Sequence, residues 1–304
     1  MSDRQVIHQN IVGLLAKLED PDADLRFMSL NDLSGILSNP ASSFLTGESR
    51  ASSQLADGLL NALEDQHGDV QNQALKCLGP LALRLPSDSL PKLLERLTNM
   101  TASQTIDTSV PNTAIRVIVD VLPHPQTGQA APANVLSAYS AVSKILIPRL
   151  TGPIPSNSGR RGSVVRGMLE KDPSKGFSSD AIDVLIKVVT CFGPLLKENE
   201  LAGLQEPVMA IIHNDTAGTV VTKRALAAIS ALVLHFSNHQ LNAFVKHLTE
   251  SLSSSNISTI QRRHLIAAIG AIARSAPAKF GPHLGSLAPF VFSTVGETGL
   301  QQVN

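Results

Sequence analysis

The stretch DLRFMSLNDL at residues 24–33 returns 45 residues later as DVQNQALKCL at residues 69–78. Both copies begin with an acidic residue and carry apolar residues at the same places in the frame. The apolar frame recurs four more times, and the successive offsets are 45, 40, 67, 44 and 40 residues. The later copies begin near Val110, Phe177, Val221 and Leu265. Because four of the five offsets are nearly equal, the sequence indicates a chain built from repeats.

Each copy of the frame is preceded in the chain by another set of apolar residues with helical spacing. In the first repeat this set lies on one face of a helix and consists of Ile7, Ile11, Leu14, Leu15 and Leu18. No segment alternates with the period of two that a half-buried strand requires. Two helices in a repeat of about 40 to 47 residues are typical of HEAT and armadillo arrays. The sequence therefore predicts an all-α solenoid of about six HEAT-type helical hairpins, with a partial seventh that starts near Phe280.

We expect residues 1–304 to form a single HEAT-repeat solenoid with an inserted flexible loop at residues 151–176. This segment is rich in Gly, Pro, Ser and Arg, and it accounts for the one long offset. Counted together with Arg149, it carries a local excess of four positive charges. The run Arg160-Arg161-Gly162-Ser163 resembles the target of basic-directed kinases, which makes Ser163 a candidate phosphorylation site. The simpler interpretation of the segment is a solvated linker.

Composition narrows the class of protein further. The chain is 43% hydrophobic but only 3% aromatic, as expected for thin helix layers filled by Leu, Ile, Val and Ala. It carries 25 basic and 25 acidic residues, which argues against a nucleic-acid binder. The sequence contains no run of about 18 apolar residues, the length that would predict a membrane-spanning helix. Cys77 and Cys191 sit in apolar runs before Gly-Pro pairs that predict helix ends, and this cysteine usage is typical of a reducing compartment.

Motifs that carry chemistry are missing from the sequence. It has no phosphate-binding loop, no dinucleotide-binding glycine pattern, no zinc-protease motif and no nucleophile elbow. His235 and His239 have the spacing of two ligands on one helix face, but no cysteine or carboxylate nearby completes a tetrahedral set. We therefore expect a protein that is not an enzyme, with no catalytic residues, no cofactor and no metal.

Polar residues between the apolar frame positions are the candidates for a partner-binding groove. They lie on the second helices of the first two repeats: Arg26, Phe27, Asn31, Asp32, Gln71, Asn72 and Gln73. Arginine and aromatic residues are enriched among interface anchors, so Arg26 and Phe27 stand out. The alternative for these side chains is structural: charge contacts between stacked repeats for Arg26, and packing under the N-terminal helix for Phe27.

The first two repeats resemble a known family in more than their core positions. Residues 24–33 closely resemble the first repeat of the cullin-associated, neddylation-dissociated proteins, which are long HEAT solenoids, and residues 64–81 resemble the second. The resemblance includes Arg26, Asn31, Asp32, Gln71, Asn72 and Lys76, which lie outside the core frame. Residues 223–226 and 267–274 are similar to later repeats, whereas residues 151–176 are not matched.

This resemblance implies a binding protein of the cytoplasm and nucleus rather than an enzyme. Members of the family clamp unmodified cullin–RING ubiquitin ligases, cover the site where the ubiquitin-like modifier is attached, and promote exchange of substrate receptors. Their N-terminal repeats embrace the C-terminal region of the cullin and its RING subunit. Since members are several-fold longer, this chain corresponds to the N-terminal portion. It is either a fragment or, as in fungal members divided between two chains, the partner of a companion chain with the C-terminal HEAT repeats.

Two other classes of HEAT scaffold are alternatives. A karyopherin-type nuclear transport receptor usually has an acidic inner surface for basic cargo, and the balanced charge of this chain gives no such signal. A phosphatase-type scaffold has more uniform repeat spacing than the offsets found here.

Overall fold

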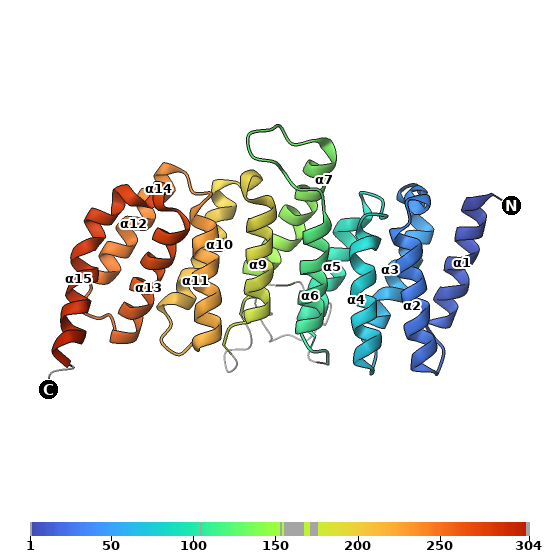
Figure 1. Ribbon diagram of the computed structural model, residues 1–304, viewed down its shortest axis with the longest axis horizontal. Coiled ribbons are helices and arrows are strands. Elements are labelled where there is room, and N and C mark those ends of the chain that lie inside the picture. Colours follow the sequence, from blue (N-terminus) through green and yellow to red (C-terminus); the bar gives the residue numbers. More distant parts are fainter. Residues whose placement is uncertain (1, 104, 153, 155–166, 171–175, 302–304) are drawn as a thin grey trace. The chain divides into compact units, whose positions relative to one another are not determined.

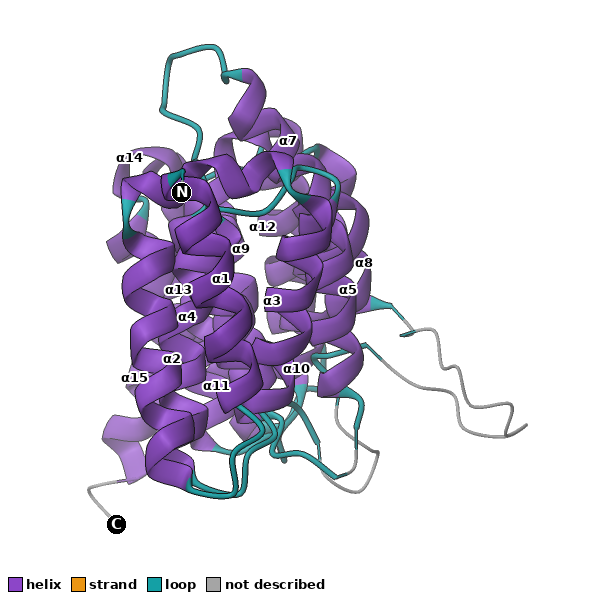
Figure 2. Cartoon of the chain, turned by 90° about the vertical axis from the view of Figure 1, so that its right-hand side faces the viewer, coloured by secondary structure: helices purple, strands orange, loops and turns teal. Residues whose placement is uncertain are grey.

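The computed structural model describes residues 2–103, 105–152, 154, 167–170 and 176–301, with side chains as far as residue 293. The chain divides into two compact units, Met1–Met168 and Leu169–Asn304. Within the described residues the regular secondary structure is helical, apart from an isolated antiparallel bridge between Glu170 and Phe177, and loops connect the helices (Figure 2). The boundary between the two units falls inside the segment 151–176, most of which lies outside the described residues.

Unit 1 contains three helical hairpins followed by a segment of mixed helical geometry. The hairpins are α1 (Asp3–Lys17) with α2 (Ala23–Ser38), α3 (Ser49–Ala62) with α4 (Gly68–Ala82), and α5 (Ser89–Thr101) with α6 (Ser109–Val121). A 3₁₀ segment, η1 (Pro40–Gly47), connects the first two hairpins. The remaining segment consists of α7 (Ala133–Ala141), the π-helical η2 (Val142–Leu146) and α8 (Ile147–Thr151).

The hairpins of unit 1 stack in two layers (Figure 1). The second helices α2, α4 and α6 pack side by side in one layer, and α1, α3, α5 and α7 form the other. The layer of second helices is the closer packed one, and Gly79 of α4 shows why: a β-carbon there would lie 3.3 Å from Cγ1 of Val121 on α6. Each hairpin thus covers the apolar face of its neighbour, as in a HEAT solenoid.

Unit 2, taken by itself, also consists of packed helices. Its helices are α9 (Ser179–Phe192), α10 (Glu198–His213), α11 (Thr219–Val233), α12 (Asn238–Ser253), α13 (Thr259–Ser275), the short α14 (Pro277–Phe280) and α15 (Leu284–Gln301). Short 3₁₀ turns, η3 (Gly193–Leu195) and η4 (Gly281–His283), follow α9 and α14. The second helices α9, α11 and α13 pack side by side, while α10 contacts α11 and α12 contacts α15 (Figure 1).

Local sequence signals set where these helices begin. Ser2, Ser237 and Ser258 each form a capping box with a glutamine three residues later, so two backbone N–H groups at the helix start are satisfied. Asp22 accepts a hydrogen bond from the Asp24 backbone N–H and is the N-cap of α2. Asn39 caps η1, whose first residue is a proline with no N–H to satisfy.

The core consists of the apolar frame positions read from the repeats. Leu30, Leu33 and Leu78 are fully buried, and each buried leucine contributes roughly 2 kcal/mol of transfer free energy. Val70 is also buried, but its counterpart in the first repeat, Leu25, is 42% exposed. The exposure differs because α4 is covered by α2 on one side and by α6 on the other, whereas among the described helices of this layer α2 is covered by α4 alone.

Hydrogen bonds tie each hairpin to the next. The thiol of Cys77 donates to the backbone carbonyl of Leu30 at 3.2 Å, and the guanidinium of Arg84 donates to the carbonyls of Leu37 and Asn39 at 3.0 and 3.2 Å. Arg84 therefore satisfies carbonyls at the C-terminal end of α2. In unit 2, Nζ of Lys279 donates to the carbonyl of Leu234 at 3.1 Å in the same manner.

These units confirm the predicted all-α HEAT-type fold, and α15 supplies the expected additional helix. The single array over residues 1–304 and the flexible loop at 151–176 stay predictions. The grouping of Arg149 with this segment was wrong: Arg149 belongs to α8 and is buried, because its guanidinium donates hydrogen bonds to α5. None of the helices in the described part of the chain is both long and apolar enough to span a bilayer.

Candidate protein-binding surface

Arg26, the strongest candidate anchor, is tied into the turns of its own chain. Its Nε and Nη2 donate to the two carboxylate oxygens of Asp65 at 2.8 and 3.2 Å, which is a bidentate pair between α2 and the turn before α4. Its Nη1 donates to the backbone carbonyls of Asp20 and Pro21 at 2.8 and 3.1 Å. Arg26 therefore fastens the first hairpin to the second, in agreement with the structural alternative for this residue.

The electrostatics of this pair favour the charged forms of both groups. Hydrogen bonding to Asp65 raises the pKa of Arg26. Burial by itself would raise the pKa of Asp65, but the hydrogen bonds from Arg26 and from the His67 backbone N–H outweigh it and lower that pKa below its ordinary value of 3.8. A partner could use Arg26 only by displacing these contacts, so a direct binding role for Arg26 stays a prediction.

Phe27 is accessible at the start of α2. Its side chain is 38% exposed, and its neighbour Met28 is 58% exposed. Leu25, in the same N-terminal part of α2, is 42% exposed. Exposed aromatic and methionine side chains are enriched in protein interfaces. Phe27 is therefore partly accessible to a partner, and its role in binding stays a prediction.

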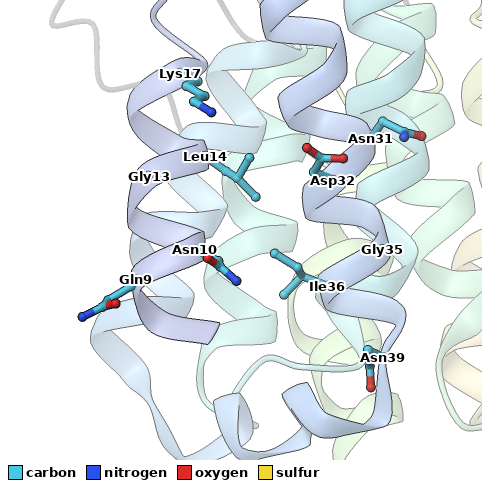
Figure 3. Close-up of a pocket in the computed structure, with 10 residues that line it drawn as sticks. All are labelled: Gln9, Asn10, Gly13, Leu14, Lys17, Asn31, Asp32, Gly35, Ile36 and Asn39. Atoms are coloured by element: carbon cyan, nitrogen blue, oxygen red, sulfur yellow. The ribbon is translucent and has the colours of Figure 1, made fainter. Parts of the chain in front are cut away.

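Asn31 and Asp32 line a groove between α1 and α2 (Figure 3). The groove has a volume of about 670 Å³, and both side chains are exposed. The other lining residues are Gln9, Asn10, Gly13, Leu14, Lys17, Gly35, Ile36 and Asn39. Gly13 of α1 and Gly35 of α2 both line the groove, and at each of them no atom lies within 4 Å of where a β-carbon would be, which leaves space there. Amide, carboxylate and ammonium groups here can hydrogen-bond a protein partner.

The three candidates on α4 have different environments. Gln73 is buried, and its Nε2 donates to Oδ1 of Asn31 at 3.3 Å across the α2–α4 contact. Gln71 is half-buried, and Asn72 is exposed. The structure thus brings Asn31 and Gln73 together and leaves Asn72 open to solvent. Ser163 lies outside the described residues, so its phosphorylation stays a prediction.

The part of the groove on α1 was missed by sequence analysis. Groove residues were expected on the second helices, and α1 was expected to contribute its apolar face to the core. The missed residues Gln9, Asn10, Gly13 and Lys17 nevertheless share one face of α1, since they are spaced by one, three and four residues. This spacing is the signal that would have identified them.

The described side chains suit binding rather than catalysis. Among the residues that the structure describes, no three His, Cys, Asp or Glu side chains form a group that could hold a metal ion. The two cysteines are buried, and burial raises the pKa of the Cys77 thiol to about 12, so this group is not a thiolate nucleophile. Stacked helical hairpins with an exposed polar groove define a HEAT-type binding scaffold.

Comparison with known proteins assigns this scaffold to a family. Residues 89–303 match the family described as "Cullin-associated NEDD8-dissociated protein 1 N-terminal part". The chain belongs to this family, whose members are non-catalytic scaffolds.

Individual relatives differ greatly in length. The N-terminal part of cullin-associated NEDD8-dissociated protein 1 from Emericella nidulans is 65% identical over 301 residues, covering 99% of this chain and 88% of the relative. Cullin-associated NEDD8-dissociated protein 2 of Mus musculus is 26% identical over 92% of this chain but only 21% of its own length. The corresponding protein 1 of Candida albicans is 27% identical over 70% of this chain and 18% of its own. The chain therefore spans about a fifth of these longer relatives.

Proposed function

We propose that this chain is a non-catalytic scaffold that binds the C-terminal region of an unmodified cullin and its RING subunit, and that takes part in substrate-receptor exchange. The observation that carries the proposal is the 65% identity, over 99% of the chain, to a relative named for cullin association and NEDD8 dissociation. The two-layered helical hairpins support it, because stacked hairpins present an extended surface suited to a large protein partner.

A companion chain with C-terminal HEAT repeats is part of the same proposal. The support is the difference in how much of each relative the chain covers. It covers 88% of a relative that is itself named an N-terminal part, but only 21% of the long relative from Mus musculus. The part of the long relatives that this chain does not cover would then have its counterpart in a second polypeptide. We propose that the complex works in the cytoplasm and nucleus.

The binding surface that we propose comprises the groove between α1 and α2 and the exposed side chains next to it. Phe27, Asn31, Asp32 and Asn72 are exposed and contribute directly. Arg26 and Gln73 are less accessible and contribute mainly by linking α2 to α4 and the turn before it, and Gln71 is half-buried. An interface of this kind is extended, so each direct contact carries a modest share of the affinity.

The test is reconstitution with purified components. The chain, with and without its companion chain, is mixed with a cullin–RING complex in unmodified and in NEDD8-modified form, and binding is measured by size-exclusion chromatography and calorimetry. The proposal expects binding to the unmodified complex and little binding to the modified one. Failure to bind the unmodified complex, even with the companion chain present, would refute it.

Two variants locate the surface in the same assay. The double variant Phe27→Ala with Asp32→Lys is expected to weaken binding by about tenfold or more, since it removes an exposed apolar contact and reverses a charge. Val12→Ala is the matched control, because Val12 lies on another face of α1 and is 60% exposed. Equal affinity of the double variant and the control would place the interface elsewhere on the chain.

A further inference from the structure

A second groove lies in unit 2, between α11 and α13. It has a volume of about 780 Å³, and small apolar side chains, including Ala227, Ala231, Ala267 and Ala271, form its floor. Leu226 and Leu234 add larger apolar side chains, and Leu234 is 49% exposed. Since small residues allow two helices to approach closely, this floor is shaped to accept another helix.

The charges around this groove have one sign. Helices α11 and α13 contain no acidic residue, although the whole chain carries 25 basic and 25 acidic residues. Their five basic residues are Lys223, Arg224, Arg262, Arg263 and Arg274. Arg224 is turned toward α9, where its Nη1 lies 3.3 Å from Oδ2 of Asp183 and 4.0 Å from Oδ1 of Asp180. Lys223 and Arg274 line the groove itself, and both are exposed. No ion pair within the described part of the chain involves either of these two residues.

The two groove cations stand near opposite ends of the floor. One helix, α12, separates α11 from α13 in the chain, so α11 and α13 run in the same direction (Figure 1). Lys223 is near the start of α11 and Arg274 near the end of α13. The lining of α11 runs from Lys223 to Leu234, a span of about 16 Å or three helical turns.

We propose that this groove binds one amphipathic acidic helix of a protein partner, about three turns long. Its small or leucine side chains would face the alanine floor, and a carboxylate near each end would meet Lys223 and Arg274. This inference goes beyond the proposed function, because it names a second recognition element in the other unit and does not depend on a cullin as the partner.

The same observations disfavour other occupants. A nucleic acid would need cations along its backbone and aromatic side chains for base stacking, whereas the groove has cations near its ends and a floor of alanines. A second copy of the same face would bring the basic residues of α11 and α13 against each other, which costs free energy. An acidic helix matches both the shape of the floor and the sign of the charge.

The experiment uses the intact chain and a labelled synthetic helix. The peptide has about 18 residues, an alanine–leucine stripe at helical spacing, two glutamates about 11 residues apart and glutamine elsewhere. Binding is measured by fluorescence anisotropy. We expect saturable binding that weakens strongly in about 0.5 M salt, and loss of binding when both glutamates are replaced by glutamine.

Variants of the chain test the two ends of the groove separately. Lys223→Glu and Arg274→Glu are each expected to weaken binding by about tenfold, and a peptide with lysine in place of the matching glutamate is expected to restore it. Ala227→Trp should block the floor at an exposed position. Lys246→Glu is the matched control, because Lys246 lies on α12 outside the groove and is 78% exposed. Circular dichroism checks that each variant retains its helices.

Several outcomes would overturn the proposal. One is absence of peptide binding to the intact chain. Another is binding that Lys246→Glu weakens as much as Lys223→Glu does. Equal binding of a single-stranded oligonucleotide that competes with the peptide would show a general affinity for anions. Self-association in sedimentation that Ala227→Trp abolishes would instead identify a second copy of the chain as the occupant.

Discussion

Replacement of Arg149 by methionine tests whether this arginine is part of the core or of a solvated basic segment. Its side chain is 10% exposed. Its Nη1 donates to the backbone carbonyl of Glu95 at 3.1 Å, to Oγ1 of Thr98 at 2.8 Å and to Oδ1 of Asn99 at 2.6 Å. Its Nη2 lies 3.5 Å from a carboxylate oxygen of Glu95. One guanidinium thus gathers the last turns of α5 against α8.

The expected loss is about 2–3 kcal/mol of the free energy of unfolding of unit 1. Hydrogen bonds from a charged donor are each worth about 1.5–3 kcal/mol, and a cation near a helix C-terminus adds about 0.5 kcal/mol. Removal of a buried cation returns part of this, since the charge no longer has to be desolvated. Methionine preserves most of the aliphatic volume, so a cavity contributes little to the loss.

The chain carries a natural probe for this experiment. It has one tyrosine and no tryptophan, and Tyr139 lies in α7, in the same helical segment as Arg149. Urea unfolding is followed by tyrosine fluorescence, which reports on this segment, and by circular dichroism, which reports on all the helices. Lys144→Met is the control, because Lys144 lies in η2 and its side chain is exposed.

The refuting result is a loss below about 0.5 kcal/mol, the usual size for an exposed surface residue. Arg149→Met and Lys144→Met would then be indistinguishable in tyrosine fluorescence. Such a result would mean that solvent replaces the hydrogen bonds to α5 at no cost.

Three further predictions concern other contacts. Asp65 has a lowered pKa, so its pair with Arg26 stabilises the fold above the ordinary pKa of 3.8 and is lost as the pH falls below it. Asp65→Asn should therefore lower the urea midpoint at neutral pH and lose this effect by about pH 2; a pH-independent difference would contradict the argument. At Gly193 a β-carbon would collide with the His235 ring, so Gly193→Ala should cost about 1–3 kcal/mol in thermal unfolding, and His235→Ala should relieve most of that loss. Cys77 should resist iodoacetamide at about pH 8 until the chain unfolds, because its pKa is near 12 and its side chain is buried; rapid native-state labelling seen by mass spectrometry would disprove this.

The helices and most of the core were predictable because period and burial coincide in a repeat. Leu30, Leu33 and Leu78 were frame positions and are buried. Leu25 was also a frame position but is 42% exposed, since burial there needs a neighbouring helix that the periodicity of a single repeat does not reveal. The N-cap of α2 also depends on local geometry. Asp22 and Asp24 are both acidic and stand two residues apart, and the folded chain uses Asp22 to accept the capping hydrogen bond.

The two Gly-Pro pairs differ in whether a helix ends at them. Both predicted a helix end, and α9 does end before Gly193-Pro194. Helix α4, however, continues through Gly79-Pro80 to Ala82. The proline at position 80 removes one backbone hydrogen bond, but Leu81 and Ala82 are buried, and their packing keeps the helix going. Tertiary contacts decided the outcome, and the dipeptide alone does not contain them.

The candidate surface was predictable in residue type but not in role. Polar residues outside the core frame were expected to face a groove, and Asn31 and Asp32 do line one. For Arg26 the sequence suggested a charge contact, but it could not identify Asp65, 39 residues away, as the partner. That pairing depends on the register between two hairpins, which only the folded chain establishes.

The hydrogen bonds between neighbouring hairpins have a consequence for how the chain could be divided. Gln73 reaches back to α2, Arg84 to the end of α2 and Lys279 to the end of α11, so each bond crosses a single interface. In the part of the chain that the structure describes, no helix has to pair with one far away along the chain, unlike the strands of a closed barrel. Severing the backbone in the connection between two hairpins would therefore leave every other interface intact. Two polypeptides could rejoin there by restoring one layer of contacts, which makes a HEAT solenoid a fold that tolerates being encoded in pieces.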